Sequence, residues 1–200
     1  EFVRNLRSVF FNFWSNGIQA DIISPNTDLT NYDLILLPNV TIISEDILDS
    51  INNVLLASNN SKIIAISNFG LYSENGLSSY NPPDNFSEKL GVRVSDFSDI
   101  TQEDIKKGNN ILETSLGRYE IVKPTRYIVL EPKNKSKAIA YLNGNIVGIE
   151  NVNKNFSWYG LPLDSLSEQE HFYNKLIHKN NIFQQVYLNA EKVIPIVRKS

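Results

Sequence analysis

Two short apolar runs, separated by a segment with helical spacing, constrain this chain more than any other feature. Leu34 to Leu37 is a continuous apolar run that ends at Pro38, and Ile63 to Ile66 is a second run of the same kind. Runs without alternating polar residues are typical of strands buried on both faces of a parallel sheet. Between them, Ser44 is a suitable helix N-cap, and apolar residues follow it at helical spacing. The order strand, helix, strand predicts an open α/β sheet with crossover helices.

The flanking segments add further predicted elements. Apolar residues at helical spacing predict a first helix from Phe2 to about Asn16, where Gly17 is a suitable stop, and Ile18 to Ile23 predicts a short strand. After Gly91 the pattern changes to short strands, with a hairpin signal at Asn143-Gly144. The strands predicted in this half span residues 92–97, 119–122, 127–130, 138–142, 146–149 and 156–159.

The C-terminal part of the sequence predicts one more helix and a tail. The helix begins at Ser167, and Glu170 three residues later would complete a capping box. Residues 186–197 have a strand-like pattern. We expect a flavodoxin-like, three-layer α/β sandwich with a mostly parallel sheet, plus antiparallel β-hairpin elements in the second half. The expected main domain spans residues 1–180, and residues 181–200 are expected to be a tail or the start of a truncated C-terminal β-domain.

Composition excludes several classes of function. The net charge is -3, with 19 Lys and Arg against 22 Asp and Glu, so no nucleic-acid or membrane partner is expected. The chain has no Cys, which excludes disulfides, thiolate metal sites and a cysteine nucleophile. This composition fits either redox compartment, so the localisation stays open, with the cytoplasm as the favoured alternative. There is no Met either, and we expect the chain to be a piece of a longer protein or a processed one.

A long loop predicted from Ser67 to Asn85 is the main candidate for a functional surface. It follows the carboxyl end of a buried strand, which is where open α/β sheets place ligands and partners. It is rich in Gly, Ser, Asn and Pro but carries several apolar side chains that would form an exposed patch. We expect it to contact another subunit, a part of the longer protein that this chain does not include, or a sugar; the alternative is that it folds back on its own domain. The candidate residues for this interface or sugar-proximal loop are Phe69, Tyr72, Glu74, Asn75 and Tyr80.

The sequence offers little that could carry catalysis. The only histidines, His171 and His178, are seven residues apart on the last predicted helix and match no metalloprotease motif. Glycine motifs for dinucleotides and phosphate loops are absent. Glu74 and Asp84 are the carboxylates of the long loop. We interpret them as solvated or partner-contacting residues in preference to a catalytic pair of a glycosidase. We expect no catalytic residue, no metal site and no cofactor in this chain.

An ordered series of segments is similar to one known family. The series comprises N-Y-D-L-I-L-L-P (31–38), S-E-D-I-L-D (44–49), I-I-A-I-S-N-F-G (63–70), Y-S-E-N-G (72–76) and L-G-V-R-V-S-D-F (90–97). Residues 138–142, 146–151 and 158–164 also fit. Together these segments resemble the trimerisation domain of family 42 β-galactosidases, over about Val3 to Ile177.

The resemblance carries its own expectations about fold and function. It implies a fold shared with class I glutamine amidotransferases, whose nucleophilic Cys would fall at Asn68, a degenerate position because an amide cannot act as that nucleophile. It implies self-association as a trimer, a catalytic barrel that is not in this chain, and a galactoside substrate reached only through the parent enzyme. The favoured function is therefore a non-catalytic oligomerisation or active-site-completing domain of a β-galactosidase-type glycoside hydrolase.

Two other functions stay open at the sequence level. One is a stand-alone amidotransferase-like or ThuA-like protein that binds a small molecule or sugar at the carboxyl edge of the sheet. The other is a carbohydrate-binding module that uses exposed aromatic side chains. Coding sequence upstream of Glu1 would separate the first function from the favoured one.

Overall fold

A computed structural model describes residues 2–24, 27–56, 61–73, 76, 87–133, 136–151, 153 and 155–182. The helices are α1 (Phe2–Ser15), η1 (Leu29–Asn31), α2 (Glu45–Leu56), α3 (Ser87–Leu90), α4 (Gln102–Lys107), η2 (Leu163–Ser165) and α5 (Gln169–Lys179). The strands are β1 (Leu34–Pro38), β2 (Ile42–Ile43), β3 (Lys62–Ile66), β4 (Tyr72–Ser73), β5 (Val92–Ile100), β6 (Ile111–Thr114), β7 (Gly117–Glu120), β8 (Thr125–Pro132), β9 (Ser136–Leu142), β10 (Asn145–Asn151) and β11 (Phe156–Tyr159).

The main sheet is mixed and has seven strands in the order β1-β3-β11-β10-β9-β6-β7. Only β1, β3 and β11 form parallel pairs, and the remaining pairs in this sheet are antiparallel. The prediction of a mostly parallel sheet was therefore wrong. Short turns join β6 to β7, β9 to β10 and β10 to β11, and such turns force antiparallel pairing within the same sheet. Asn143 and Gly144 both have positive φ, as the predicted hairpin between β9 and β10 requires.

Two smaller sheets complete the β-structure. β5 and β8 form an antiparallel ribbon, and β2 pairs with β4 in parallel. Residues 18–24 form no strand, so the predicted strand at Ile18–Ile23 was wrong; no described residue pairs with this segment in a ladder. β6 and α4 lie in a region where the sequence predicted nothing. The predicted strand at 186–197 lies outside the described residues.

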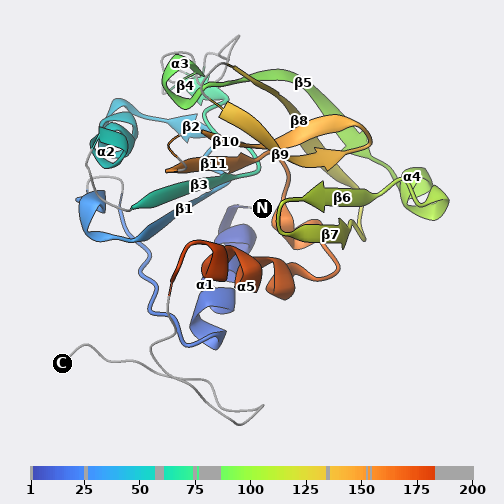
Figure 1. Cartoon of the computed structure of the whole chain (residues 1–200), viewed down its shortest axis with the longest axis horizontal. Coiled ribbons are helices and arrows are strands. Elements are labelled where there is room, and N and C mark those ends of the chain that lie inside the picture. The colour runs from blue at the N-terminus through green and yellow to red at the C-terminus, as the bar shows by residue number, and fades with distance from the viewer. Residues whose placement is uncertain are drawn as a thin grey trace.

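Apolar clusters cover both faces of the main sheet. Helices α1 and α5 lie on one side of this sheet, and α2 lies on the other (Figure 1). On β3, Ile64 and Ile66 belong to the cluster that includes residues of α1 and α5, whereas Ile63 and Ala65 belong to the cluster that includes residues of α2 and the β5–β8 ribbon. Alternate residues of a strand point to opposite faces, so an unbroken apolar run is the pattern that a doubly covered strand needs. The two runs that the sequence singled out are β1 and β3.

Helix termini show both a confirmed and a wrong prediction. The Ser44 hydroxyl accepts a hydrogen bond from the backbone N–H of Ile47 at 3.3 Å, so the N-cap of α2 is confirmed. The predicted capping box at Ser167 was wrong, because α5 starts two residues later with Glu168 as its N-cap and no side-chain cap bond. The Ser167 N–H instead donates to the Glu120 carbonyl at the end of β7 at 2.9 Å. A capping box does occur at α4, between Thr101 and Asp104.

Close packing between β9 and β10 gives a first testable prediction. A Cβ added at Gly148 would lie 2.6 Å from Ala140 Cβ, too close for real atoms. We expect Gly148→Ala to lower the free energy of unfolding by about 1–3 kcal/mol, as overpacked cores do. Adding Ala140→Gly should recover part of that loss, measured by urea unfolding. An unchanged or larger loss in the double variant would show that the Ala140 methyl is not the cause.

Candidate functional site

The carboxyl edge of the parallel strands carries a small two-stranded ribbon formed by β2 and β4. The ribbon joins the loop after β1 to the loop after β3, with Ile42 opposite Tyr72 and Ile43 opposite Ser73. Backbone hydrogen bonds hold the two loops together. Gly70 N–H donates to Val40 O at 3.0 Å, and Tyr72 N–H donates to Thr41 O at 3.1 Å. Two loops far apart in the sequence therefore form one surface.

The turn that carries β4 is held rigidly by the core beneath it. Ser67, directly after β3, has a φ of 62°, a left-handed conformation that is costly for a residue with a Cβ. Its N–H donates to Tyr159 O at 2.7 Å, and its carbonyl accepts a bond from Trp158 Nε1 at 2.8 Å. The Phe69 ring packs edge-on against Trp158, with 5.5 Å between ring centroids. These contacts determine where the following residues emerge.

The exposed part of this surface is apolar. Tyr72 is 43 % exposed and Ile42, opposite it in the ribbon, is 55 % exposed. By contrast, Phe69 is 0 % exposed and Leu71 is buried, so the first part of the predicted loop folds back into the core. Phe69 fits the alternative in which the loop folds back on its own domain. Tyr72 fits the alternative in which the loop faces outward.

The structure describes only some of the remaining predicted site residues. Glu74, Asn75, Tyr80 and the second loop carboxylate Asp84 lie outside the described residues. Asn68 is half-buried in the turn after β3. Ile42 was missed by sequence reasoning, and its only signal was an apolar pair shortly after Pro38.

Among the described residues, the strained turn at Ser67 does not bring a nucleophile and a base together. Nucleophile elbows place the reactive residue on a strained turn directly after a strand, which here is Ser67 rather than Asn68. Ser67 is buried, and both histidines lie on α5, where the His171 ring is 6.4 Å from that of Tyr119. Within the described ranges, no group of three or more His, Asp and Glu side chains could hold a metal ion, and no helix is long and apolar enough to cross a membrane.

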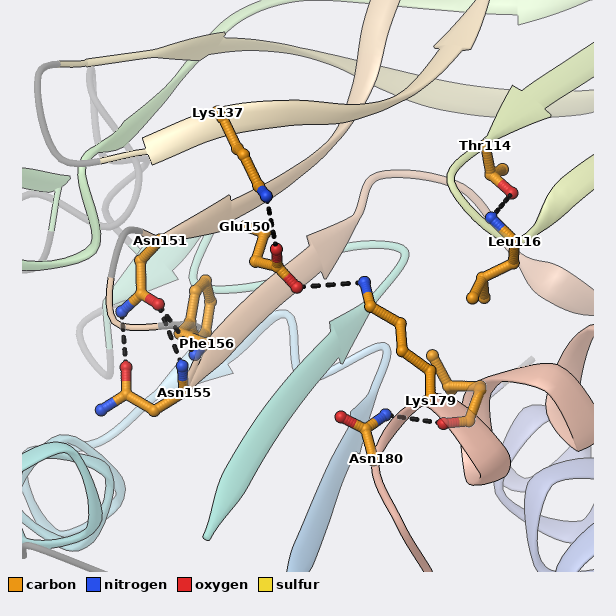
Figure 2. A network of polar contacts seen from close by, with 10 residues as sticks. Thr114, Leu116, Lys137, Glu150, Asn151, Asn155, Phe156, Lys179 and Asn180 are labelled. Atoms are coloured by element: carbon orange, nitrogen blue, oxygen red, sulfur yellow. Dashed lines mark hydrogen bonds and ion pairs between the residues drawn. The ribbon is translucent and has the colours of Figure 1, made fainter. Parts of the chain in front are cut away.

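A charge cluster around a buried carboxylate lies between the sheet and α5 (Figure 2). The Glu150 carboxylate on β10 is 3.0 Å from Lys179 Nζ on α5 and 3.2 Å from Lys137 Nζ on β9. Burial alone would raise the pKa of Glu150, but hydrogen bonds and positive charge from the two lysines outweigh it and hold the pKa below its ordinary value. One carboxylate between two cations is not the pair of facing carboxylates that glycoside hydrolysis needs. The cluster joins α5 to two strands.

The neighbouring turn between β10 and β11 is closed by an asparagine (Figure 2). Asn151 Oδ1 accepts bonds from the backbone N–H groups of Asn155 and Phe156, at 3.1 and 3.2 Å. Its Nδ2 donates to Asn155 Oδ1 at 2.6 Å. These bonds hold the turn that places β11 antiparallel to β10. On its other side, β11 pairs in parallel with β3.

Several solved structures share this fold, either as part of a longer chain or over nearly the whole chain. The β-galactosidase of Bacillus circulans sp. alkalophilus matches with a TM-score of 0.74 and 14 % identity, over 94 % of this chain and 28 % of that one. The cold-adapted β-galactosidase of Rahnella sp. R3 matches with a TM-score of 0.72 and 19 % identity, over 90 % of this chain and 27 % of that one. A GMP synthase-like protein of Thermoplasma acidophilum matches more distantly, with a TM-score of 0.52 and 11 % identity, over 90 % of this chain and 89 % of that one.

The sequence itself identifies the family. Residues 2–146 match the family described as the β-galactosidase trimerisation domain. The chain belongs to this family, which confirms the resemblance drawn from its sequence motifs. It spans about 27 % of the length of the β-galactosidase chains that it matches.

The charge cluster gives a prediction with a pH dependence. Folding lowers the pKa of Glu150, so its carboxylate stabilises the folded state fully at pH values above its pKa in the unfolded chain, which is about 4.3. This stabilisation is lost as the pH falls through the pKa in the folded state. We expect Glu150→Gln to lower the free energy of unfolding by about 1–3 kcal/mol at pH 7. The difference from the unaltered chain should shrink as the pH falls from about 6 to about 3, measured by urea unfolding at each pH.

A matched control for this prediction is Glu113→Gln. Glu113 also pairs with a cation, Arg118 Nη2 at 3.1 Å, but both side chains are exposed. Exposed pairs contribute little, so this variant should change stability by less than about 1 kcal/mol across the pH range. Equal effects of the two variants would contradict the role given to burial at Glu150.

Proposed function

We propose that this chain is the assembly domain of a family 42 β-galactosidase-type glycoside hydrolase and that it holds three copies of that enzyme together as a trimer. The observation that carries the proposal is the family match over residues 2–146. The catalytic barrel and the galactoside site would then belong to other parts of the parent enzyme. The covered length agrees with this division, because the chain corresponds to about a quarter of each matched β-galactosidase.

The surface that we assign to assembly is formed by β2 and β4. Exposed Tyr72 and Ile42 lie side by side on a ribbon whose backbone is fixed by the core, so little conformational freedom would be lost on binding. Tyrosine is enriched among the residues that contribute most to protein interfaces. The predicted residues Glu74, Asn75 and Tyr80 continue along the chain from this ribbon and belong to the same proposal.

The finer description of the fold is also part of this proposal. We regard the domain as a flavodoxin-like, three-layer sandwich in which α1 and α5 form one outer layer and α2 with the β5–β8 ribbon forms the other. The opposed apolar clusters on the two faces of β3 support this description. The likeness to the GMP synthase-like protein extends over nearly the whole of both chains and favours an amidotransferase-like ancestry of the fold.

The assembly surface is tested in the full-length parent enzyme. Tyr72→Ala should weaken trimer formation at least about tenfold, because truncating a central interface tyrosine costs about 2 kcal/mol or more and 1.4 kcal/mol is already tenfold. Sedimentation velocity over a dilution series measures the association, and circular dichroism checks that the variant is folded. Tyr141→Ala is the matched control, since Tyr141 on β9 is 44 % exposed, almost the same as Tyr72. An unchanged oligomer for Tyr72→Ala at all dilutions would show that this ribbon is not the interface.

The second functional candidate, a stand-alone amidotransferase-like protein, makes an opposite prediction about activity. The proposed assembly domain should hydrolyse neither an aryl galactoside nor glutamine when it is pure and separate from other chains, because catalysis would need groups from the barrel. Product release is followed by absorbance for the galactoside and by an ammonia assay for glutamine. Glutamine hydrolysis that Ser67→Ala abolishes would overturn the assignment in favour of the amidotransferase-like function.

A further inference from the structure

Strand β5 forms an exposed edge of the β5–β8 ribbon and runs along the rim of the molecule (Figure 1). It is nine residues long, and β8 is its only ladder partner among the described residues. Phe97 near the middle of this edge is 46 % exposed, and its neighbours Ser95, Asp96 and Asp99 are exposed as well. A long exposed edge strand that carries an apolar side chain is a place where a strand of another molecule can pair.

The direction of the backbone groups at Phe97 follows from its neighbour on β8. Ile128 lies opposite Phe97, and the Ile128 N–H donates to Gly160 O at 2.7 Å instead of to β5. Residues directly opposite each other in an antiparallel pair either exchange both backbone bonds or exchange none. The N–H and C=O groups of Phe97 therefore point outward, toward the open side of β5, and so do those of Asp99 two residues later.

A carboxylate already occupies the outward N–H of Phe97. Asp96 Oδ1 accepts a hydrogen bond from this N–H at 2.7 Å. A second strand that paired with β5 would need the same N–H, so it would have to displace the Asp96 carboxylate. It would also bring a charged group close to the new ladder, where removal from water is costly. Asp96 therefore opposes pairing at the centre of the edge in two ways.

A β-bulge interrupts the same edge directly before Asp96. Val94 and Asp96 lie opposite consecutive residues of β8, so Ser95 between them is an extra residue on β5. The Ser95 hydroxyl donates to Val129 O on β8 at 3.1 Å and holds the bulge against the ribbon. Bulges bend and twist a strand and disturb the even spacing of backbone groups that a straight partner strand needs.

We propose that Asp96 and the bulge at Ser95 prevent the outer edge of β5 from pairing with the same edge of a second copy of this chain. Charged residues and bulges on edge strands have this effect in other β-sheet proteins. They leave Phe97 exposed without allowing the ladder that would bury it. The inference does not depend on the proposed trimer. In a trimer, however, contacts between β5 edges would join one assembly to the next, so preventing them keeps the assembly closed.

The test is carried out in the full-length parent protein with Asp96→Val. This change removes both the acceptor and the charge, and valine favours the extended backbone of a strand. We expect species larger than those of the unaltered protein, with an association constant at least about tenfold higher, because no carboxylate has to be displaced. Sedimentation velocity over a concentration series measures these species. Asp96→Asn is isosteric and keeps an acceptor for the Phe97 N–H, so it should give a smaller increase.

Glu113→Val is the matched control. Glu113 is also exposed on a strand, but β6 has a ladder partner on both sides, β7 and β9. The two valine variants change the net charge equally and add the same apolar side chain. Hydrogen exchange followed by mass spectrometry gives a second readout, because the amides of residues 95–99 should become protected in the larger species of Asp96→Val.

Three results would overturn the proposal. The first is unchanged association in both Asp96 variants, and the second is equal association of Asp96→Val and Glu113→Val. The third is the formation of larger species in which the amides of residues 95–99 stay unprotected. The assembly surface at Tyr72 is judged by the appearance of smaller species and this proposal by larger ones, so the two can fail independently.

Discussion

Strand β3 forms parallel ladders with β1 on one side and β11 on the other, and its apolar residues fill both faces of the sheet. Burying a strand on both faces removes nearly all of its side chains from water, which is the dominant favourable term in folding. The helices and the β5–β8 ribbon are needed because each face of β3 must be covered. The arrangement of layers follows from this one strand.

The same strand also positions the candidate interface. Directly after β3, the left-handed backbone at Ser67 turns the chain, and the Trp158 indole on β11 holds that turn through a hydrogen bond. Phe69 fills the space beside Trp158, and Tyr72 emerges on the outside. An apolar surface that rests on so rigid a support is suited to lasting contact with another protein surface, since little order has to be created when it binds.

The charge cluster at Glu150 stabilises the structure in the described part of the chain. Glu150 is neutralised by two lysines and links α5 to the sheet, and Asn151 closes the adjacent turn. A structural cluster of this kind is what the proposed assembly role requires. Membership of the β-galactosidase trimerisation domain family agrees with such a role.

The sequence by itself determined the local elements. Leu34–Leu37 and Ile63–Ile66 are strands, Ser44 caps α2, and Asn143-Gly144 forms a hairpin, because apolar periodicity, capping and turn chemistry act over a few residues. Tertiary structure decided how these elements pair. It brought β11 beside β3 from far along the chain, placed Ile42 opposite Tyr72, buried Phe69 and left residues 18–23 without a ladder partner among the described residues. Strand pairing depends on which distant surfaces cover each other, and no local pattern in the sequence carries that information.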